Sequence, residues 1–208
     1  MIFKTLCVGP CEANCYIIAE DKNNKAIIID PGDEPEKIKR VLSKNILEPA
    51  MIINTHGHID HIGADDAFGV IVYIHKDDLI FFDDPNLNLS GFLSKPVRIN
   101  SVFGTISDRE EIGLGKIKLQ VIHTPGHTPG GVCLLLKEPE ANILFSGDTL
   151  FCQGIGRTDL PFASSEQLAK SIRERLFTLD NQVRVYPGHG PSTTIGAEKE
   201  SNPLCANL

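Results

Sequence analysis

Short apolar runs, rich in Ile, Leu and Val, recur along the whole chain and predict a series of buried strands. Several of them stop at Gly, Pro or Asp, residue types that end strands and open turns. The first two runs flank a Gly9-Pro10 turn, which is typical of a β hairpin. The expected strands are Ile2–Val8, Cys15–Ala19, Ala26–Ile29, Met51–Asn54, Ile71–Ile74, Lys116–Ile122, Val132–Leu136, Ile143–Phe145 and Val183–Tyr186.

Apolar residues at helical spacing mark several segments between these strands. Glu34–Ser43 is predicted to be a surface helix, and Lys76–Phe82 is also expected to be helical. Ser164–Phe177 is an amphipathic segment, and Ser164 or Ser165 would cap the N-terminus of its helix.

The order of the elements is similar in the two halves of the chain: a run of strands, a helix and a further strand. Two sheets packed together with helices outside would satisfy this order, so we expect an α/β fold in a single domain over residues 1–208. Side chains at the strand ends would then meet along one edge of the sandwich. Asp83–Ser94 is predicted to be a mobile loop and a candidate substrate lid.

Charge and composition narrow the class of partner. The chain of 208 residues has a net charge of -7 at pH 7, with 41% hydrophobic and 23% charged residues. Such an acidic chain offers no basic stripe for nucleic acid, and no apolar run is long enough to span a bilayer. Polar residues near the N-terminus interrupt any signal-peptide core, so a cytoplasmic location is expected.

The segment Thr55-His56-Gly57-His58-Ile59-Asp60-His61 places three histidines and a carboxylate directly after an apolar run. Imidazole nitrogens and carboxylate oxygens are ligands of borderline and hard divalent cations. His56 and His58, two residues apart on extended backbone, would project to the same side and share one ion. Asp60 and His61 would lie beyond a turn, at the start of a helix, which suggests a second ion.

Three later segments have the same form, an apolar strand that ends in a Gly-flanked ligand type. Glycine at these places permits a sharp turn and a close approach of the backbone. The segments are His123-Thr124-Pro125-Gly126-His127-Thr128, Ser146-Gly147-Asp148-Thr149 and Pro187-Gly188-His189-Gly190.

The series H-x-H-x-D-H, G-H-T, G-D-T and G-H resembles the metallo-β-lactamase superfamily over essentially the whole chain. The resemblance implies a four-layer αββα sandwich with the site at the edge where the loops of the two sheets converge. It also implies the metal ligands of this chain. They are His56, His58 and His127 for one ion, Asp60, His61 and His189 for the other, and Asp148 as a bridge between them.

The remaining histidines and the cysteines have no role in this pattern. His123 and His75 are expected to be structural. The six cysteines are expected to be reduced, since the chain shows no secretory signal. The spacing of Cys7, Cys11 and Cys15 matches no common zinc or iron–sulfur motif.

Within the superfamily the chain resembles glyoxalase II-like hydrolases, through G-D-T-L-F at 147–151, G-I-G-R at 154–157 and Y-P-G-H-G-P at 186–191. Arg157 corresponds to a basic residue that contacts the substrate in that group. Asp159 stands where those enzymes have a tyrosine, and the chain stops about where their C-terminal helical domain would begin. The resemblance therefore supports the reaction class more than a glutathione substrate. Asp148 stands where the best-known metallo-β-lactamases have a cysteine, which argues against antibiotic hydrolysis.

The implied activity is hydrolysis of small thioesters with two divalent ions, zinc being the first choice and iron or manganese the alternatives. A metal-bound hydroxide would attack the thioester carbonyl, and Asp60 would orient this nucleophile as well as hold an ion. The partner would be a small-molecule thioester, neither nucleic acid nor membrane, and the oligomeric state stays open. The alternative is an enzyme resembling persulfide dioxygenases, with one iron held by His56, His127 and Asp148. The run Arg157-Thr158-Asp159 resembles the corresponding run of those enzymes.

Overall fold

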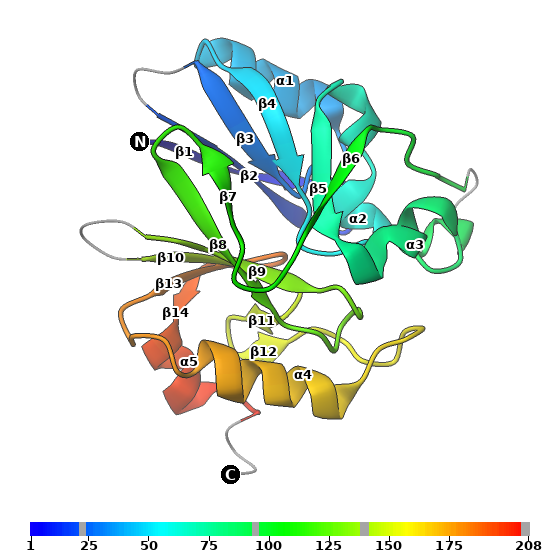
Figure 1. The fold of residues 1–208 in the computed structure, drawn as a ribbon. Coiled ribbons are helices and arrows are strands. Elements are labelled where there is room, and N and C mark those ends of the chain that lie inside the picture. Colours follow the sequence, from blue (N-terminus) through cyan, green and yellow to red (C-terminus); the bar gives the residue numbers. More distant parts are fainter. Residues whose placement is uncertain (21–23, 93–95, 138–141, 205–208) are drawn as a thin grey trace.

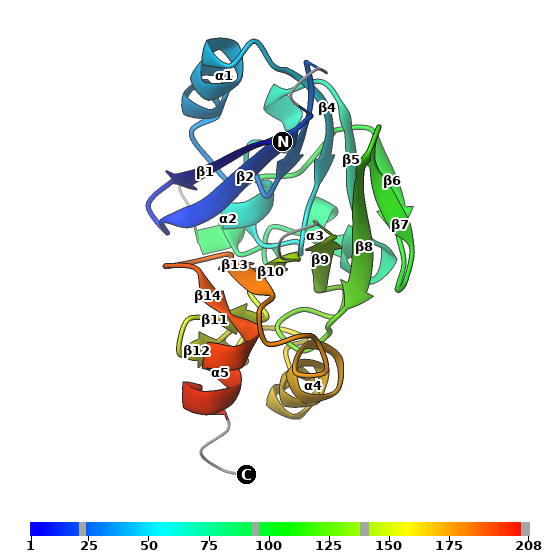
Figure 2. The ribbon, with the colours of Figure 1, turned by 90° about the vertical axis from the view of Figure 1, so that its left-hand side faces the viewer.

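The computed structural model describes residues 1–20, 24–92, 96–137 and 142–204. Its strands form two six-stranded sheets and a short two-stranded ribbon. The sheets pack against each other with helices on both outer sides (Figure 1), and the view turned by 90° shows the same layers (Figure 2). The expected αββα sandwich is confirmed.

The first sheet has the strand order β1-β2-β3-β4-β5-β6. It opens with the predicted antiparallel hairpin, and from β3 to β6 neighbouring strands are parallel. Parallel neighbours need crossover connections, so the helices of this half lie between the strands in sequence. The strands are β1 (Ile2–Val8), β2 (Ala13–Ala19), β3 (Lys25–Ile29), β4 (Glu48–Ile53), β5 (Ile71–His75) and β6 (Phe103–Ile106).

The second sheet has the order β14-β13-β10-β9-β8-β7. All its neighbours are antiparallel except β10 and β13, which run in the same direction. Its strands are β7 (Glu111–Leu114), β8 (Ile117–His123), β9 (Val132–Leu136), β10 (Ile143–Gly147), β13 (Arg184–Pro187) and β14 (Thr193–Thr194). The separate ribbon consists of β11 (Leu150–Phe151) and β12 (Gly154–Ile155).

The helices bury their apolar faces against the sheets. In the first half these are α1 (Pro35–Lys44), α2 (Ile59–Ile62) and α3 (Leu79–Asp83); in the second half they are α4 (Ser165–Ser171) and α5 (Ile195–Ser201). The Ser164 side chain caps α4 by accepting a hydrogen bond from the Gln167 amide. A π-helical turn over Ile172–Leu176 continues α4, so the predicted helix is present with a change of hydrogen-bond register near its end.

Three apolar clusters hold the layers together. Ile38 and Leu42 of α1 join the cluster on the outer face of the first sheet, and Leu168 joins the corresponding cluster on the second. The middle cluster fills the space between the sheets and contains alternate residues of facing strands, such as Ile27, Ile29, Leu119 and Val121. This alternation is why the strands read as continuous apolar runs: both faces of each sheet are covered.

Several short elements were not predicted. β6 and β7 have four residues each with a glycine inside, and β14 has only two residues. α5 was not predicted either, although Thr194 caps it by accepting from the Ala197 amide. No helix in the described part of the chain has the length and apolar character needed to cross a membrane.

The predicted lid, Asp83–Ser94, is described only as far as Phe92, and its last two residues lie outside the described ranges. Asn88 in this segment is fully buried, and its side-chain amide donates to the Phe81 and Val97 carbonyls. Its backbone carbonyl accepts from the Ile59 amide over 2.8 Å. The segment is therefore tied to α2, which carries two candidate ligands, while its mobility stays a prediction.

Candidate metal centre

The turns that follow four strands bring the predicted ligands together. β4 leads into His56 and His58, β8 into His127, β10 into Asp148 and β13 into His189. Because β10 and β13 are parallel, Asp148 and His189 leave the sheet at the same end. All seven predicted ligands fall into three overlapping groups whose ligand atoms lie within 4.8 Å of one another. The groups are His56 with His58 and His127, His56 with His61 and Asp148, and Asp60 with His61 and His189.

The first group consists of three buried histidines. His58 Nδ1 and His127 Nε2 are 2.9 Å apart although the residues are 69 positions apart in sequence. The His56 ring centroid lies 4.8 Å from that of each of the other two rings. The three imidazoles therefore converge, as they would around one shared ion.

The second of the two main groups consists of Asp60, His61 and His189 and is built around α2. The Asp60 and His61 side chains project from this helix towards His189, with Asp60 Oδ2 3.3 Å and His61 Nε2 3.4 Å from His189 Nε2. His189 is partly exposed, whereas His61 is fully buried. This second group thus lies nearer to solvent than the first.

Asp148 lies between the two groups. Its Oδ1 is 3.4 Å from His61 Nε2, and its Oδ2 is 3.5 Å from His127 Nε2 and 3.6 Å from His189 Nε2. The neighbouring chain leaves no space to spare, because a Cβ at Gly188 would overlap the Asp148 carboxylate. This is the placement that a bridging carboxylate requires.

The residues present fit metal ions. His56 Nε2, His58 Nε2 and Asp148 Oδ1 are buried and have no hydrogen-bond partner in the described protein. Lone pairs buried in this way are costly unless something accepts or binds them. Imidazole and carboxylate donors suit zinc, iron or manganese, so the chemistry of the set does not select among these ions.

The protonation states of the histidines differ between the groups. Burial and the neighbouring His127 lower the pKa of His58 to about 3, and burial also lowers the pKa of His56 well below its usual range. Both rings are thus neutral at pH 7, the state in which imidazole binds a metal. For His61, burial opposes protonation, but the carboxylates of Asp60, Asp148 and Asp30 outweigh it and raise its pKa to about 10.

A second layer of hydrogen bonds orients the ligands. The Asp30 carboxylate accepts from the Thr55 amide and hydroxyl, each at 2.7 Å, and lies 3.0 Å from His61 Nδ1. His127 Nδ1 lies 2.8 Å from the Arg157 carbonyl, and His189 Nδ1 lies 3.0 Å from the Cys11 carbonyl. Partners of this kind set the ring orientation and the tautomer of a ligating histidine.

Sequence reasoning missed the role of Asp30. A signal was present, because Ile27–Ile29 runs into Asp30-Pro31-Gly32 in the same strand-to-glycine form as the ligand segments. Taken alone, this pattern indicates only that a strand ends at Asp30.

Asp78, at the N-terminus of α3, was missed as well. Its buried carboxylate accepts from the Gly57 amide at 3.0 Å, the Gly130 amide at 2.6 Å and the Thr128 hydroxyl at 2.7 Å. It thereby joins the turn between His56 and His58 to the turn that follows His127. Its partners are 21 to 52 positions away, so no local pattern marks it.

Arg157, the candidate substrate residue, is exposed and forms a two-pronged ion pair with Asp159. Its Nε and Nη2 donate to the two carboxylate oxygens, each over 2.8 Å. Its backbone, by contrast, contacts the His127 ring directly.

His75 and His123 stack on each other, with ring centroids 4.1 Å apart and planes at 13°. Together with Asp77 they bring ligand-type atoms close. However, imidazole lone pairs lie in the ring plane, so an ion between two stacked rings would lie out of both planes. His123 Nε2 also lies 2.9 Å from the Pro129 carbonyl. The geometry agrees with a structural role for both residues.

The cysteines in the described part of the chain offer no alternative ligand set. The five within the described residues are free, and Cys205 lies outside them. Cys11 is near the centre, but burial and the nearby Asp60 and Asp148 carboxylates raise the pKa of its thiol. A protonated thiol is a poor ligand and a poor nucleophile.

Comparison with known proteins adds a family and several relatives. The profile of the metallo-beta-lactamase superfamily matches residues 8–189. A probable metallo-hydrolase of Bacillus subtilis is 38% identical over 98% of this chain and 97% of its own length. A Haemophilus influenzae protein named hydroxyacylglutathione hydrolase GloC is 38% identical over 93% of this chain and 92% of its own length.

Three crystal structures show the same fold. BLEG-1, titled a B3 metallo-beta-lactamase, has a TM-score of 0.88 and 37% identity over 98% of this chain and 99% of its own. TTHA1623 in a di-iron-bound form has a TM-score of 0.80 and 34% identity over 97% and 99%. ETHE1 from Myxococcus xanthus has a TM-score of 0.79 and 28% identity over 99% and 85%.

Proposed function

The chain belongs to the metallo-β-lactamase superfamily of metal-dependent enzymes, and from this premise we propose that it hydrolyses small thioesters with two metal ions. The observation that carries the proposal is the position of Asp148 between a three-histidine group and an Asp60–His61–His189 group. The identity to the Haemophilus influenzae relative named a hydroxyacylglutathione hydrolase supports a thioester as the substrate class.

In the proposed reaction, side chains of the protein bind the metal ions and orient the attacking water. When bound, two divalent ions would lower the pKa of a water molecule, which makes it a nucleophile at neutral pH, and would polarise the carbonyl of the substrate. The neutral rings of His56 and His58 would hold the first ion, and His61 and His189 would hold the second. Burial opposes ionisation of Asp60, but His61 and His189 outweigh it and lower its pKa. Asp60 therefore stays ionised, and it can accept a hydrogen bond that orients a water molecule while also acting as a ligand.

No side-chain nucleophile is needed. Cys11 is the nearby thiol, and its raised pKa leaves it protonated at neutral pH. Direct attack by water avoids an acyl-enzyme and releases a carboxylate and a thiol. Arg157 would then bind a carboxylate of the substrate, provided that the substrate displaces Asp159.

The alternative is a dioxygenase with one iron. His127 Nε2 lies 3.5 Å from Asp148 Oδ2, and the His56 ring lies beside His127, so two histidines and one carboxylate are available for iron. The likeness to ETHE1 from Myxococcus xanthus supports this alternative. The resemblance of the sequence to persulfide dioxygenases is a second support.

One preparation can separate these activities. The protein is expressed with zinc, iron and manganese supplied together, purified without chelator or metal-affinity resin, and its bound metals are counted by mass spectrometry. The same sample is then assayed for thiol release from a thioester, for oxygen uptake with a persulfide and for opening of a chromogenic β-lactam. His58→Ala, prepared identically, is the control for contaminating enzymes.

Thiol release with about two ions per chain, absent from His58→Ala, is the expected result. Oxygen uptake with one iron and no thiol release would replace the proposal by the dioxygenase. Opening of the β-lactam alone would replace the proposal by the metallo-beta-lactamase activity after which BLEG-1 is named.

A further inference from the structure

The loop between Arg157 and Ser164 is attached at both ends to the turn that carries His127. At one end His127 Nδ1 lies 2.8 Å from the Arg157 carbonyl, and at the other the Ser164 amide donates to the Gly126 carbonyl over 2.7 Å. The residues between these two attachments therefore form a short loop anchored on the turn that carries a metal ligand. They include Arg157's partner, Asp159, and the aromatic residue Phe162.

Phe162 has an unusual backbone conformation. The Ala163 amide donates to the Leu160 carbonyl over 3.1 Å, which closes a four-residue turn with Pro161 second and Phe162 third. The φ angle of Phe162 is +63°. Proline at the second position and a positive φ at the third are the marks of a type II turn, in which the third residue is normally glycine. A bulky aromatic residue in this conformation is strained.

The side chain of Phe162 is also 64% exposed. The fold therefore gains little burial from this ring, although it bears the backbone strain. None of the aromatic ring contacts found among the described residues involves Phe162. A strained and exposed apolar residue in a loop anchored beside a site has an explanation if it is covered when a ligand binds.

We infer that Phe162 is a specificity residue that contacts an apolar group of the substrate, so that thioesters with an aliphatic or aromatic substituent are preferred. The inference rests on the proposed thioester hydrolysis. The apolar group belongs to either the acyl part or the thiol part of the substrate, and both parts lie next to the carbonyl that reacts. Phe162 would act by binding energy alone, and it takes no part in the chemical step.

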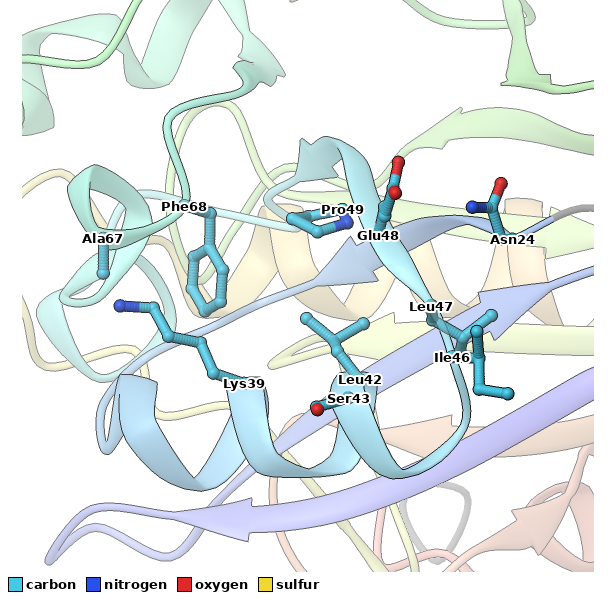
Figure 3. Close-up of a pocket in the computed structure, with 10 residues that line it drawn as sticks. All are labelled: Asn24, Lys39, Leu42, Ser43, Ile46, Leu47, Glu48, Pro49, Ala67 and Phe68. Carbon is cyan, nitrogen blue, oxygen red and sulfur yellow. The ribbon is translucent and has the colours of Figure 1, made fainter.

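The chain offers a matched control in Ile46. Its φ is +55° and it is 82% exposed, so it combines the same two features. It lies at the end of α1, beside a surface pocket of about 410 Å³ that Leu42, Leu47 and Phe68 help to line (Figure 3). Ile46 precedes β4 while His56 follows it, and a six-residue strand separates the two by roughly 20 Å.

Four proteins are compared: the wild type, Phe162→Gly, Phe162→Leu and Ile46→Gly. Both glycine variants relieve a positive φ, and each is expected to raise the melting temperature by about 2–4 °C. The catalytic measurement is kcat/KM over two thioester series. One series lengthens the acyl chain with a small polar thiol, and the other varies the thiol from polar to benzyl with an acetyl group.

In Phe162→Gly we expect kcat/KM for the most apolar member of one series to fall by ~10-fold or more, with the smallest thioester unchanged. The series that responds identifies the part of the substrate that Phe162 contacts. Phe162→Leu should keep most of the preference, and Ile46→Gly should keep all of it. An unchanged preference in Phe162→Gly, or an equal loss for every substrate, would overturn the inference.

A binding measurement keeps this inference separate from the proposed function. Thioether analogues, in which a methylene replaces the carbonyl, cannot be hydrolysed, and their binding is followed by calorimetry. Weaker binding of the apolar analogue to Phe162→Gly than to Ile46→Gly supports the contact. Equal binding to the two glycine variants refutes it. If the wild type cleaves no thioester, the proposed function fails, and the inference that rests on it fails as well.

Discussion

The Asp30 carboxylate and the His61 ring meet in the interior, with Asp30 Oδ2 3.0 Å from His61 Nδ1. The same oxygen accepts from the Thr55 hydroxyl, and Oδ1 accepts from the Thr55 amide. In the neutral form of the ring, the form that binds a metal, an acceptor at Nδ1 keeps the proton there and leaves Nε2 free, and Nε2 is the atom that faces Asp148 and His189. Asp30 thus joins the end of β3 to the helix that carries Asp60 and His61.

Asp30→Asn is expected to weaken binding at the second group by ~10- to 100-fold. An amide has only one oxygen, so its NH₂ must face a donor of Thr55 or His61. Metal content after dialysis against chelators of increasing strength measures the effect. Asp83→Asn, an exposed acid-to-amide change on α3, is the control. Equal metal retention in the two variants would contradict the role of Asp30.

Asp148→Ala is expected to lower metal occupancy at both groups and to abolish turnover. The carboxylate lies within 3.6 Å of a histidine of each group, so its loss removes one ligand from each ion and one negative charge between them. Metal counting by mass spectrometry alongside the thioester assay tests this. A variant that keeps both ions and full activity would show that Asp148 is not shared.

His123→Gln is expected to leave metal stoichiometry unchanged, whereas His127→Gln in the same turn should lose metal. His123 stacks on His75 and its Nε2 lies by the Pro129 carbonyl, away from the converging rings. Metal counts on the two variants decide the matter. Loss of one equivalent from His123→Gln would mean that the wrong histidine was assigned in this turn.

The ligands could be predicted because each is marked locally, by an apolar strand that runs into a glycine-flanked His or Asp. The layer order followed from the alternation of strands and helices. The supporting groups could not be found in this way. Asp30 contacts residues 25 and 31 positions away, and Asp78 contacts a residue 52 positions away. Such contacts exist only once the sheets are packed.

The short strands β6 and β7 could not be predicted from the sequence for a different reason. β6 and β7 each contain a glycine, and their pairing depends on the neighbouring β5 and β8 rather than on their own sequence. The turn at Phe162 could not be predicted either, because Leu160-Pro161-Phe162-Ala163 lacks the glycine that normally marks a type II turn. The positive φ of Phe162 appears only in the folded chain.

Asp78 is expected to make stability depend on pH. Burial raises its pKa to about 6 from 3.8, against the hydrogen bonds that it accepts. Folding therefore takes up a proton between these values, and the stability contributed by this group is present below pH 4 and lost as the pH rises through about 6. The unfolding free energy of the wild type minus that of Asp78→Asn should thus become more positive by up to ~3 kcal/mol from pH 7 to pH 4.

Denaturant unfolding at several pH values measures this difference, and the metal ligands cancel because both proteins contain them. Asp66 provides a control of opposite sign. Partial burial raises the pKa of Asp66, but hydrogen bonds from Ser101 and Asn100 outweigh burial and lower it. The corresponding difference for Asp66→Asn should therefore not become more positive towards pH 4. A constant difference for Asp78→Asn would show that its pKa is not raised.

Arg157 and Asp159 give a pair of predictions with opposite directions. The hydrogen bonds from Arg157 lower the pKa of Asp159 to about 2, so the carboxylate is ionised in any practical assay and competes with an anionic substrate for the guanidinium. Arg157→Ala should raise KM for a thioester that carries a carboxylate and leave kcat nearly unchanged, if the contact is equal in the ground and transition states. Asp159→Asn frees the guanidinium and should lower the same KM.

Neither change should affect an uncharged thioester, which is the control substrate, and the Arg157 carbonyl that contacts His127 is retained in both variants. A KM that rises for charged and uncharged substrates alike in Arg157→Ala would mean that the side chain supports the loop and does not bind the substrate.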